Sequence, residues 1–325
     1  MNMPLQQRGI PASRLSLGCM GFGGEWDASK PITGEHVKQA HEAVEAALGA
    51  GIHFFDHANI YTRGKAEKVF GQVLKERPGL REQIIIQSKC GIRLYDGDDE
   101  APGRYDFSKE HIIASVDDSL KRLGIPYLDI LLLHRPDPLM DRYEVAEALH
   151  QLKFSGKVRY FGVSNMSAGQ IRLLQSALGE PLIVNQLEMS LLKAGFVETG
   201  VNVNQAVAAD NVFPEGTLEY CQLENIQLQA WSPLAQGLFS GRSTADQSEA
   251  VQNTAALVKR YAEEKNTAPE AIVLAWLLKH PAQIQPVIGT VNPQRIAACG
   301  EAVHVTLTRE EWYKLFITSR GRAMA

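Results

Sequence analysis

Cysteine is scarce in this 325-residue chain, and its four copies are widely scattered. None of them belongs to a CxxC pair, the spacing typical of zinc sites and redox-active disulfides. Small secreted folds held together by disulfides need closely spaced cysteines, so the composition disfavours that class. The sequence instead predicts a reduced, cytoplasmic protein, in which the cysteines are Cys19, Cys90, Cys221 and Cys299.

Positive charge, long apolar runs and an export signal are also lacking. The net charge of −4 leaves no basic excess to neutralise the phosphates of a nucleic acid. No apolar run reaches the roughly 20 residues that span a bilayer. Residues Met1–Gln7 lack both the charged and the apolar regions of a signal peptide. Since no apolar surface stripe marks an interface either, we expect a monomer that acts on a small molecule, with no nucleic-acid or membrane partner.

A dinucleotide-binding glycine fingerprint is missing as well. Residues 18–24 are rich in glycine but lack the GxGxxG spacing, which disfavours a doubly wound open sheet. Eight short apolar segments alternate with segments of helical spacing, and no break in composition marks a linker. This alternation predicts a single (β/α)8 barrel domain over residues 1–325. The expected strands are Leu15–Leu17, Phe54–Phe55, Ile84–Ile86, Leu128–Leu133, Val158–Val163, Leu182–Asn185, Ile226–Trp231 and Pro286–Ile288.

Two features depart from a regular barrel. The segment Leu5–Ile10, with Arg8-Gly9 as its turn, predicts an N-terminal hairpin that plugs the bottom of the barrel. The gaps Glu188–Glu215 and Pro233–Glu249 are long for barrel loops. Long loops that follow strands lie on the catalytic face, so both gaps are expected to contact a ligand.

Four reactive side chains stand at the ends of expected strands. Asp56 and Tyr61 follow the second strand, Lys89 ends the third, and His134 ends the fourth. Each alone has an ordinary structural explanation, as a helix cap, a packing residue, a surface charge or a buried histidine. Because the carboxyl ends of barrel strands share one face, all four are expected to meet there, and together they indicate an active site.

These four residue types suit proton donation to a carbonyl. A tyrosine normally titrates near ~10, which makes it a weak acid at neutral pH. An ammonium group beside the phenol is expected to lower that pKa, and an aspartate is expected to keep the lysine charged and oriented. The hypothesis is therefore that Tyr61 is the general acid, tuned by Lys89 and Asp56, while His134 orients the carbonyl.

The later strand ends offer groups for a hydride-donating cofactor. Ser164, Asn165 and Gln186 could bond a carboxamide, and Trp231 offers a flat face for a nicotinamide ring. The loop after Trp231 could wrap a pyrophosphate, and a helix start with one arginine suits a further phosphate. The predicted contacts in these two segments are Ser232, Leu234, Gln236, Gly237, Gly289 and Arg295.

With these motifs in place, the chain resembles the aldo-keto reductases, and among them the YdhF-like oxidoreductases of bacteria. The resemblance implies a (β/α)8 barrel that reduces aldehydes and ketones with NADP(H) and without a metal. It also implies a catalytic tetrad of Asp56, Tyr61, Lys89 and His134, with Thr290 and Arg295 at the adenosine phosphate. It runs from Leu17 to about Arg295, and the motifs that carry it are Phe55–Tyr61, Leu132–Asp137, Gly156–Asn165, Trp231–Leu234 and Pro286–Thr290.

The chain departs from the family pattern at the cofactor tail. Many members carry a lysine where this chain has Gly289, and a Glu-Asn pair where it has Ala298 and Cys299. The remaining threonine and arginine still favour NADP over NAD. Beside the tetrad, His57 replaces the commoner threonine.

Two other functions stay open. A metal-dependent barrel hydrolase would use Asp56, His57 and His134 as ligands, but such enzymes place histidines two residues apart on a strand, and His53 and His57 are four apart. A redox-sensing module would hold the cofactor with little turnover, and the intact tetrad argues for retained chemistry. The carbonyl substrate itself is not indicated, although Trp26 is expected to wall its pocket.

Overall fold

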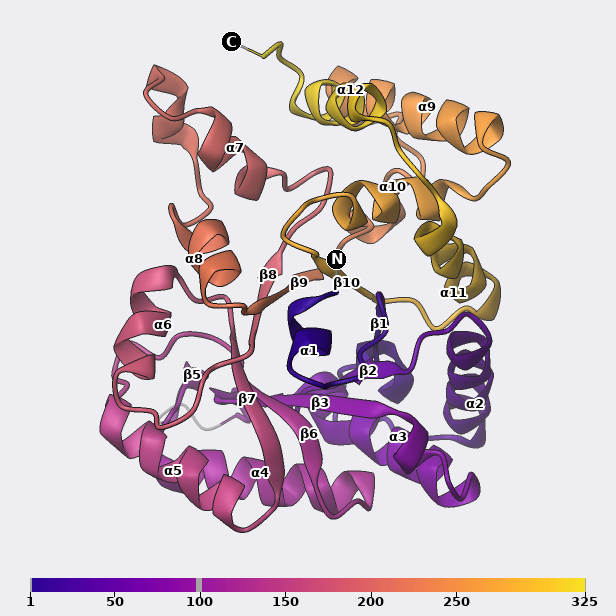
Figure 1. Ribbon diagram of the computed structural model, residues 1–325. Coiled ribbons are helices and arrows are strands. Elements are labelled where there is room, and N and C mark those ends of the chain that lie inside the picture. The colour runs from indigo at the N-terminus through magenta and orange to yellow at the C-terminus, as the bar shows by residue number, and fades with distance from the viewer. Residues whose placement is uncertain (1, 98–100, 325) are drawn as a thin grey trace.

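The computed structural model describes residues 2–97 and 101–324 and contains one closed barrel of eight parallel strands (Figure 1). Around the barrel the strands follow the order β1-β10-β9-β8-β7-β6-β3-β2. The predicted (β/α)8 architecture is confirmed, and each expected strand overlaps an observed one. Their bounds are β1 Ser16–Gly18, β2 Phe54–Asp56, β3 Ile85–Cys90, β6 Leu128–Leu133, β7 Val158–Ser164, β8 Val184–Glu188, β9 Gln227–Trp231 and β10 Gln285–Ile288.

Helices surround the ring of strands on the outside, as Figure 1 shows. Ten-residue α10 is buried on nearly all sides, which explains why its sequence is almost wholly apolar. The α-helices are α1 Pro4–Gln7, α2 Gly34–Gly49, α3 Lys65–Glu76, α4 Lys109–Leu123, α5 Arg142–Phe154, α6 Ala168–Gln175, α7 Gly195–Val201, α8 Thr217–Leu223, α9 Glu249–Glu264, α10 Pro269–Leu278, α11 Pro293–Gly300 and α12 Arg309–Arg320. Short 3-10 helices are η1 Met20–Gly23, η2 Tyr61–Gly64, η3 Arg81–Gln83, η4 Ala206–Asp210, η5 Ala235–Gly237 and η6 Glu301–His304.

The predicted N-terminal hairpin is wrong, because the segment forms the helical turn α1. Pro4 occupies the first turn, where its fixed φ favours a helix. After the helix the chain turns away at Gly9, which has a φ of 78°. Even so, the turn covers the barrel bottom. Met3 and Leu5 are fully buried, in one cluster with apolar strand residues. The strand members of that cluster are Phe54, Ile85, Ile130, Leu132 and Val184.

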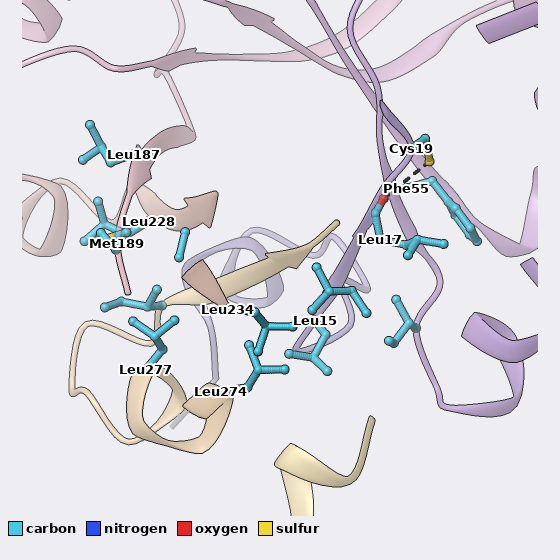
Figure 2. Packing of buried hydrophobic residues seen from close by; sticks show 14 of the residues in the cluster. Leu15, Leu17, Cys19, Phe55, Leu187, Met189, Leu228, Leu234, Leu274 and Leu277 are labelled. Carbon is cyan, nitrogen blue, oxygen red and sulfur yellow. Dashed lines mark hydrogen bonds between the residues drawn. The ribbon is translucent and has the colours of Figure 1, made fainter. Parts of the chain in front are cut away.

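A second, larger apolar cluster fills the space between the strands and the outer helices. Figure 2 shows part of it, with Leu15 and Leu17 of the β1 region and Leu274 and Leu277 of α10. The cluster fixes the strands from outside while α1 closes one end. The carboxyl ends of the strands are therefore left to carry polar groups.

Both long gaps carry short helices at this carboxyl face. The gap 188–215 contains α7 and η4, and the gap 233–249 contains η5. A small hairpin of β4 (Ile92–Arg93) and β5 (Arg104–Tyr105) stands beside the barrel. In the described part of the chain, no helix combines the length and apolar character needed to cross a membrane.

Removing the α1 anchor is expected to loosen the barrel bottom. Leu5→Ala would leave a cavity among fully buried neighbours, so the free energy of unfolding should fall by about 2 to 5 kcal/mol. Gln7→Ala, on the exposed side of the same turn, should change it by less than about 0.5 kcal/mol. Urea denaturation measures both variants, and equal effects would show that α1 does not anchor the core.

Candidate active site

The four predicted catalytic residues converge at one point of the carboxyl face. Asp56 ends β2, Tyr61 opens η2, Lys89 lies in β3 and His134 follows β6. The Lys89 ammonium donates hydrogen bonds to Asp56 Oδ2 at 2.6 Å, to Tyr61 Oη at 2.9 Å and to the His57 carbonyl at 3.0 Å. The tyrosine and His134 rings lie edge to face with centroids 6.1 Å apart. Hydrogen bonds thus connect the Asp56 carboxylate, the Lys89 ammonium and the Tyr61 phenol in a row, and the His134 imidazole lies beside the phenol.

A layer of buried glutamines holds the other oxygen of Asp56. Oδ1 accepts hydrogen bonds from Gln87 Nε2 at 2.6 Å and from Gln186 Nε2 at 3.2 Å. Both amides also donate to Gln229 Oε1, at 2.8 and 2.9 Å. Gln229 Nε2 in turn donates to Gln285 Oε1 at 2.9 Å. Since all these side chains are at most 2% exposed, the carboxylate is oriented by protein groups from four strands.

Burial raises the pKa of Tyr61 above its ordinary value, because a phenolate in the barrel would lose its hydration. The Lys89 charge lowers that pKa, as predicted from the sequence, but burial outweighs it. For Lys89 itself, burial lowers the pKa, but Asp56 and Tyr61 raise it by more, so the net direction is upward. The structure therefore holds a charged lysine beside a protonated phenol, which is the state needed in a proton donor.

His134 is neutral. Burial lowers its pKa well below the ordinary value, and the charges of Lys89 and Arg135 lower it further. Its Nδ1 is buried and has no hydrogen-bond partner among the described residues. The imidazole nevertheless lines the cavity, so a neutral ring stands beside the phenol and can donate only one hydrogen bond.

A cavity of about 640 Å³ opens above the tetrad and runs toward α11. Asp56, Tyr61 and His134 line one end, while Lys89 lies behind them, fully covered. Every predicted cofactor contact lines the same cavity. These contacts are Ser164, Asn165, Gln186, Trp231, Ser232, Leu234, Gln236, Gly237, Gly289, Thr290 and Arg295.

In the middle of the cavity, the predicted carboxamide contacts bond one another. Ser164 Oγ donates to the Gln186 carbonyl at 2.9 Å, and Asn165 Nδ2 donates to Ser164 Oγ at 2.8 Å. Trp231 Nε1 donates to Asn165 Oδ1 at 3.1 Å. Asn165 itself has a φ of 58°, in the left-handed region that asparagine tolerates better than most residues. The strand ends of β7, β8 and β9 are thereby held in a fixed arrangement.

The loop after β9 has an unusual backbone. Ser232, Ala235 and Gln236 all have positive φ, between 46° and 57°, and Gly237 follows at 83°. Non-glycine residues in this region are strained and cluster at ligand-binding segments. Gly237 also approaches the Arg295 guanidinium, since a Cβ there would lie 3.3 Å from Nη2. The strain supports the predicted role of this loop in ligand binding.

Arg295, at the far end of the cavity, is already engaged by protein groups. Its Nε lies 3.2 Å from Glu270 Oε1 and its Nη2 donates to Ser240 Oγ at 3.3 Å. The sequence did not predict Glu270 as a site residue, because an acidic side chain in the first turn of a helix such as α10 is common. The carboxylate fixes the guanidinium, and Arg295 still lines the cavity.

Trp26 is not among the described residues that line the cavity. Its ring is 42% exposed, in the loop between η1 and α2. Lys65 anchors this loop by donating to the carbonyls of Asp27 at 2.9 Å and Lys30 at 3.1 Å. A role for Trp26 in the substrate wall therefore stays a prediction.

Comparisons with known proteins agree with the barrel fold and with the reductase-like site. The Aldo/keto reductase family model covers residues 14–316. The chain belongs to this family. A 6-dehydroglucose reductase of Agrobacterium fabrum (strain C58 / ATCC 33970) is 39% identical over 319 residues, 97% of each chain. Oxidoreductase YdhF of Escherichia coli (strain K12) is 39% identical over 281 residues, 86% of this chain and 87% of YdhF. An aldo-keto reductase from Klebsiella pneumoniae, solved in complex with NADPH, has a TM-score of 0.72 at 24% identity, over 94% of this chain and 90% of that one.

Membership in the aldo-keto reductase family confirms the predicted resemblance, the oxidoreductase class and NADP(H) as the cofactor type. The ligand set of the alternative hydrolase is not brought together. Asp56 is bound to Lys89, while both ring nitrogens of His57 are buried without a partner among the described residues. Over residues 2–97 and 101–324, no cluster of three His, Cys, Asp or Glu side chains could hold a metal.

His57, next to the predicted catalytic Asp56 of this aldo-keto reductase, is a fully buried histidine whose ring nitrogens have no hydrogen-bond partner among the described residues. Its ring packs on Phe70 with centroids 4.6 Å apart. Burial, with a contribution from the Lys89 charge, lowers its pKa to about 3. The unfolded chain takes up a proton at this histidine near pH 6.5, whereas the folded chain does so only near pH 3. Stability must therefore be lost as the pH falls from about 6.5 toward 3.

His57→Thr should remove that loss. Between about pH 6 and pH 4.5, the free energy of unfolding of the parent should fall relative to the variant, by up to about 1.4 kcal/mol per pH unit. Urea denaturation at several pH values measures the difference, in which the other titrating groups cancel. Parallel curves for the two proteins would contradict a buried neutral histidine.

Proposed function

We propose that this protein reduces aldehyde or ketone carbonyls to alcohols, with Tyr61 as the proton donor. The observation that carries the proposal is the position of the Lys89 ammonium, 2.6 Å from Asp56 Oδ2 and 2.9 Å from Tyr61 Oη. A buried ammonium beside a phenol stabilises the phenolate that remains after proton transfer. The phenol lines the cavity, where a carbonyl oxygen can reach it.

The residues divide the proton chemistry among them. Tyr61 transfers its proton to the carbonyl oxygen, and Lys89 compensates the negative charge left on the phenol. Asp56, held by Lys89 and two glutamine amides, keeps the ammonium in place. His134, being neutral, donates a hydrogen bond that orients the carbonyl without competing as an acid. When bound, NADPH supplies the hydride that adds to the carbonyl carbon.

The residues in the middle of the cavity fit the nicotinamide end of that cofactor. The hydrogens of Gln186 Nε2 go to Asp56 and Gln229, so its Oε1 is left to accept. Ser164 Oγ and Asn165 Oδ1 also keep lone pairs after accepting one bond each. Three acceptors suit the amide hydrogens of a carboxamide. Trp231, tied to Asn165, offers the flat face against which the ring would pack.

The other end of the cavity fits the adenosine phosphate less completely. Thr290 and Arg295 would hold a 2′-phosphate, while the backbone of α11 adds little, since Pro293 has no N–H group and the Arg295 N–H donates to Asn292 Oδ1 at 3.0 Å. Gly289 provides no ammonium where many family members have a lysine. We therefore propose NADP over NAD, with the preference resting on the guanidinium that Glu270 fixes.

Turnover of carbonyls with NADPH tests the proposal directly. The panel should contain simple aldehydes and polyhydroxylated ones, because one relative is named a 6-dehydroglucose reductase. We expect NADPH oxidation that depends on the carbonyl and yields one alcohol per NADPH consumed. Tight NADPH binding without turnover of any carbonyl would favour the redox-sensing alternative.

Tyr61→Phe should remove the proton donor. We expect kcat to fall by about 10²- to 10⁴-fold, the usual contribution of a general acid. NADPH affinity, measured by protein fluorescence, should change little, because the lost hydroxyl bonds Lys89. An active Tyr61→Phe variant would overturn the assignment of the acid.

Lys89→Met should raise the pKa of Tyr61 further, since the lysine charge is what lowers it. Alcohol oxidation needs the phenolate, so the pH at which oxidation with NADP⁺ begins should move upward. Lys65→Met is the matched control, because that buried lysine donates to the loop carbonyls of Asp27 and Lys30. An unshifted pH profile in Lys89→Met would contradict the proposal that the lysine lowers the pKa of the Tyr61 phenol.

We also propose that residues 1–325 form one domain that acts as a monomer in the cytoplasm. One barrel with one continuous outer cluster supports the single domain. All four cysteines are buried and unpaired, which suits a reducing compartment. Light scattering of the purified protein tests the oligomeric state.

A further inference from the structure

Arg135 is a cation in the cavity wall that no carboxylate of the described residues neutralises. It follows His134 at the end of β6, and its half-buried side chain lines the cavity. Its guanidinium carbon lies 5.8 Å from the centroid of the Trp231 ring, a cation–π contact. Among residues 2–97 and 101–324, no carboxylate lies within 4.0 Å of its nitrogens.

The other charges of the cavity are satisfied by protein groups. Asp56 is paired with Lys89, and Arg295 is paired with Glu270. The acid closest to Arg135 in the chain, Asp137, accepts from the backbone N–H groups of Phe107 at 2.8 Å and Leu139 at 2.9 Å. Arg135 is therefore the cation that the described cavity lining leaves without a carboxylate, at the end where the tetrad lies.

The backbone around this arginine is fixed relative to the reacting groups. Asn165 Nδ2 donates to the His134 carbonyl at 3.3 Å, and Asn165 Oδ1 accepts from the Trp231 indole at 3.1 Å. One asparagine thus ties the residue before Arg135 to the ring on which its guanidinium rests. A cation positioned in this way can hold one end of a substrate while the other end meets Tyr61.

We propose that Arg135 binds a carboxylate of the substrate, so that the protein prefers aldehydes that also carry a carboxylate group. A guanidinium presents two parallel N–H groups that match the two oxygens of a carboxylate. The half-buried position beside an indole strengthens such a pair relative to one in open water. This inference rests on the proposed carbonyl reduction and adds its substrate class.

Matched pairs of substrates test the inference. Oxo acids of three to six carbons, such as 4-oxobutanoate, are compared with the n-alkanals of equal length, such as butanal, and NADPH oxidation is followed. The parent protein should show a higher kcat/KM for at least one oxo acid than for its alkanal. In Arg135→Gln that ratio should fall by at least about tenfold, mainly through KM, because a charge-assisted hydrogen bond is lost. Arg135→Lys should lie between the two.

Arg142→Gln is the matched control, since Arg142 also stacks on an aromatic ring, that of Tyr143, but does not line the cavity. Its ratio should equal that of the parent. An unchanged ratio in Arg135→Gln would overturn the inference and leave a solvated cation. An equal loss for both substrate classes, together with weaker NADPH binding, would also overturn it and assign Arg135 to the cofactor.

A binding measurement separates failure of this inference from failure of the proposed reduction. Butanoate and butan-1-ol are titrated into the NADPH-bound protein, and saturation-transfer NMR reports binding without any reaction. Binding of butanoate that Arg135→Gln abolishes would support the carboxylate site even if no aldehyde were reduced. Equal binding of the two compounds, or butanoate binding that survives in the variant, would overturn it.

Discussion

The buried ion pair between Lys89 and Asp56 is the constraint on which the active site depends. Taking both charges out of water costs several kcal/mol per ion, so the pair is stable only if every remaining hydrogen-bonding position is filled. The protein fills them with the Tyr61 hydroxyl, the His57 carbonyl and two glutamine amides. The phenol is thus one of the groups that satisfy the lysine, and this requirement keeps it aimed at the point where chemistry is proposed.

The glutamine layer follows from the register of the strands. Asp56 pairs with Gln87 across β2 and β3, and Gln229 of β9 pairs with Gln186 on one side and Gln285 on the other. Neighbours at one height in a barrel point inward together, so these side chains form one polar layer above the apolar one that α1 seals. Because Gln186 belongs to this layer and also to the cofactor cavity, the carboxylate and the proposed carboxamide site share one amide.

Strand order and the four reactive strand ends were predictable, because apolar periodicity and the common face of parallel strands determine both. The helical turn α1 was not, since a proline at a first turn and a positive-φ glycine are compatible with either form. Gln87 was visible after the apolar run Ile84–Ile86, but no local pattern says that its amide reaches Asp56. The net pKa of Tyr61 also required the structure, because burial and the Lys89 charge act in opposite directions and only the fold decides which is larger.

Charge is distributed along the cavity in a way that bears on selectivity. Arg295 is fixed by Glu270 at one end of the cavity, and Arg135 rests on Trp231 at the other end, where Tyr61 and His134 are neutral. A neutral centre suits a reaction in which negative charge develops only on the carbonyl oxygen, where a phenol and an imidazole can stabilise it. Fixed cations at the two ends then act on groups that do not react. Binding energy from those remote groups can position the carbonyl without altering the acidity of the proton donor.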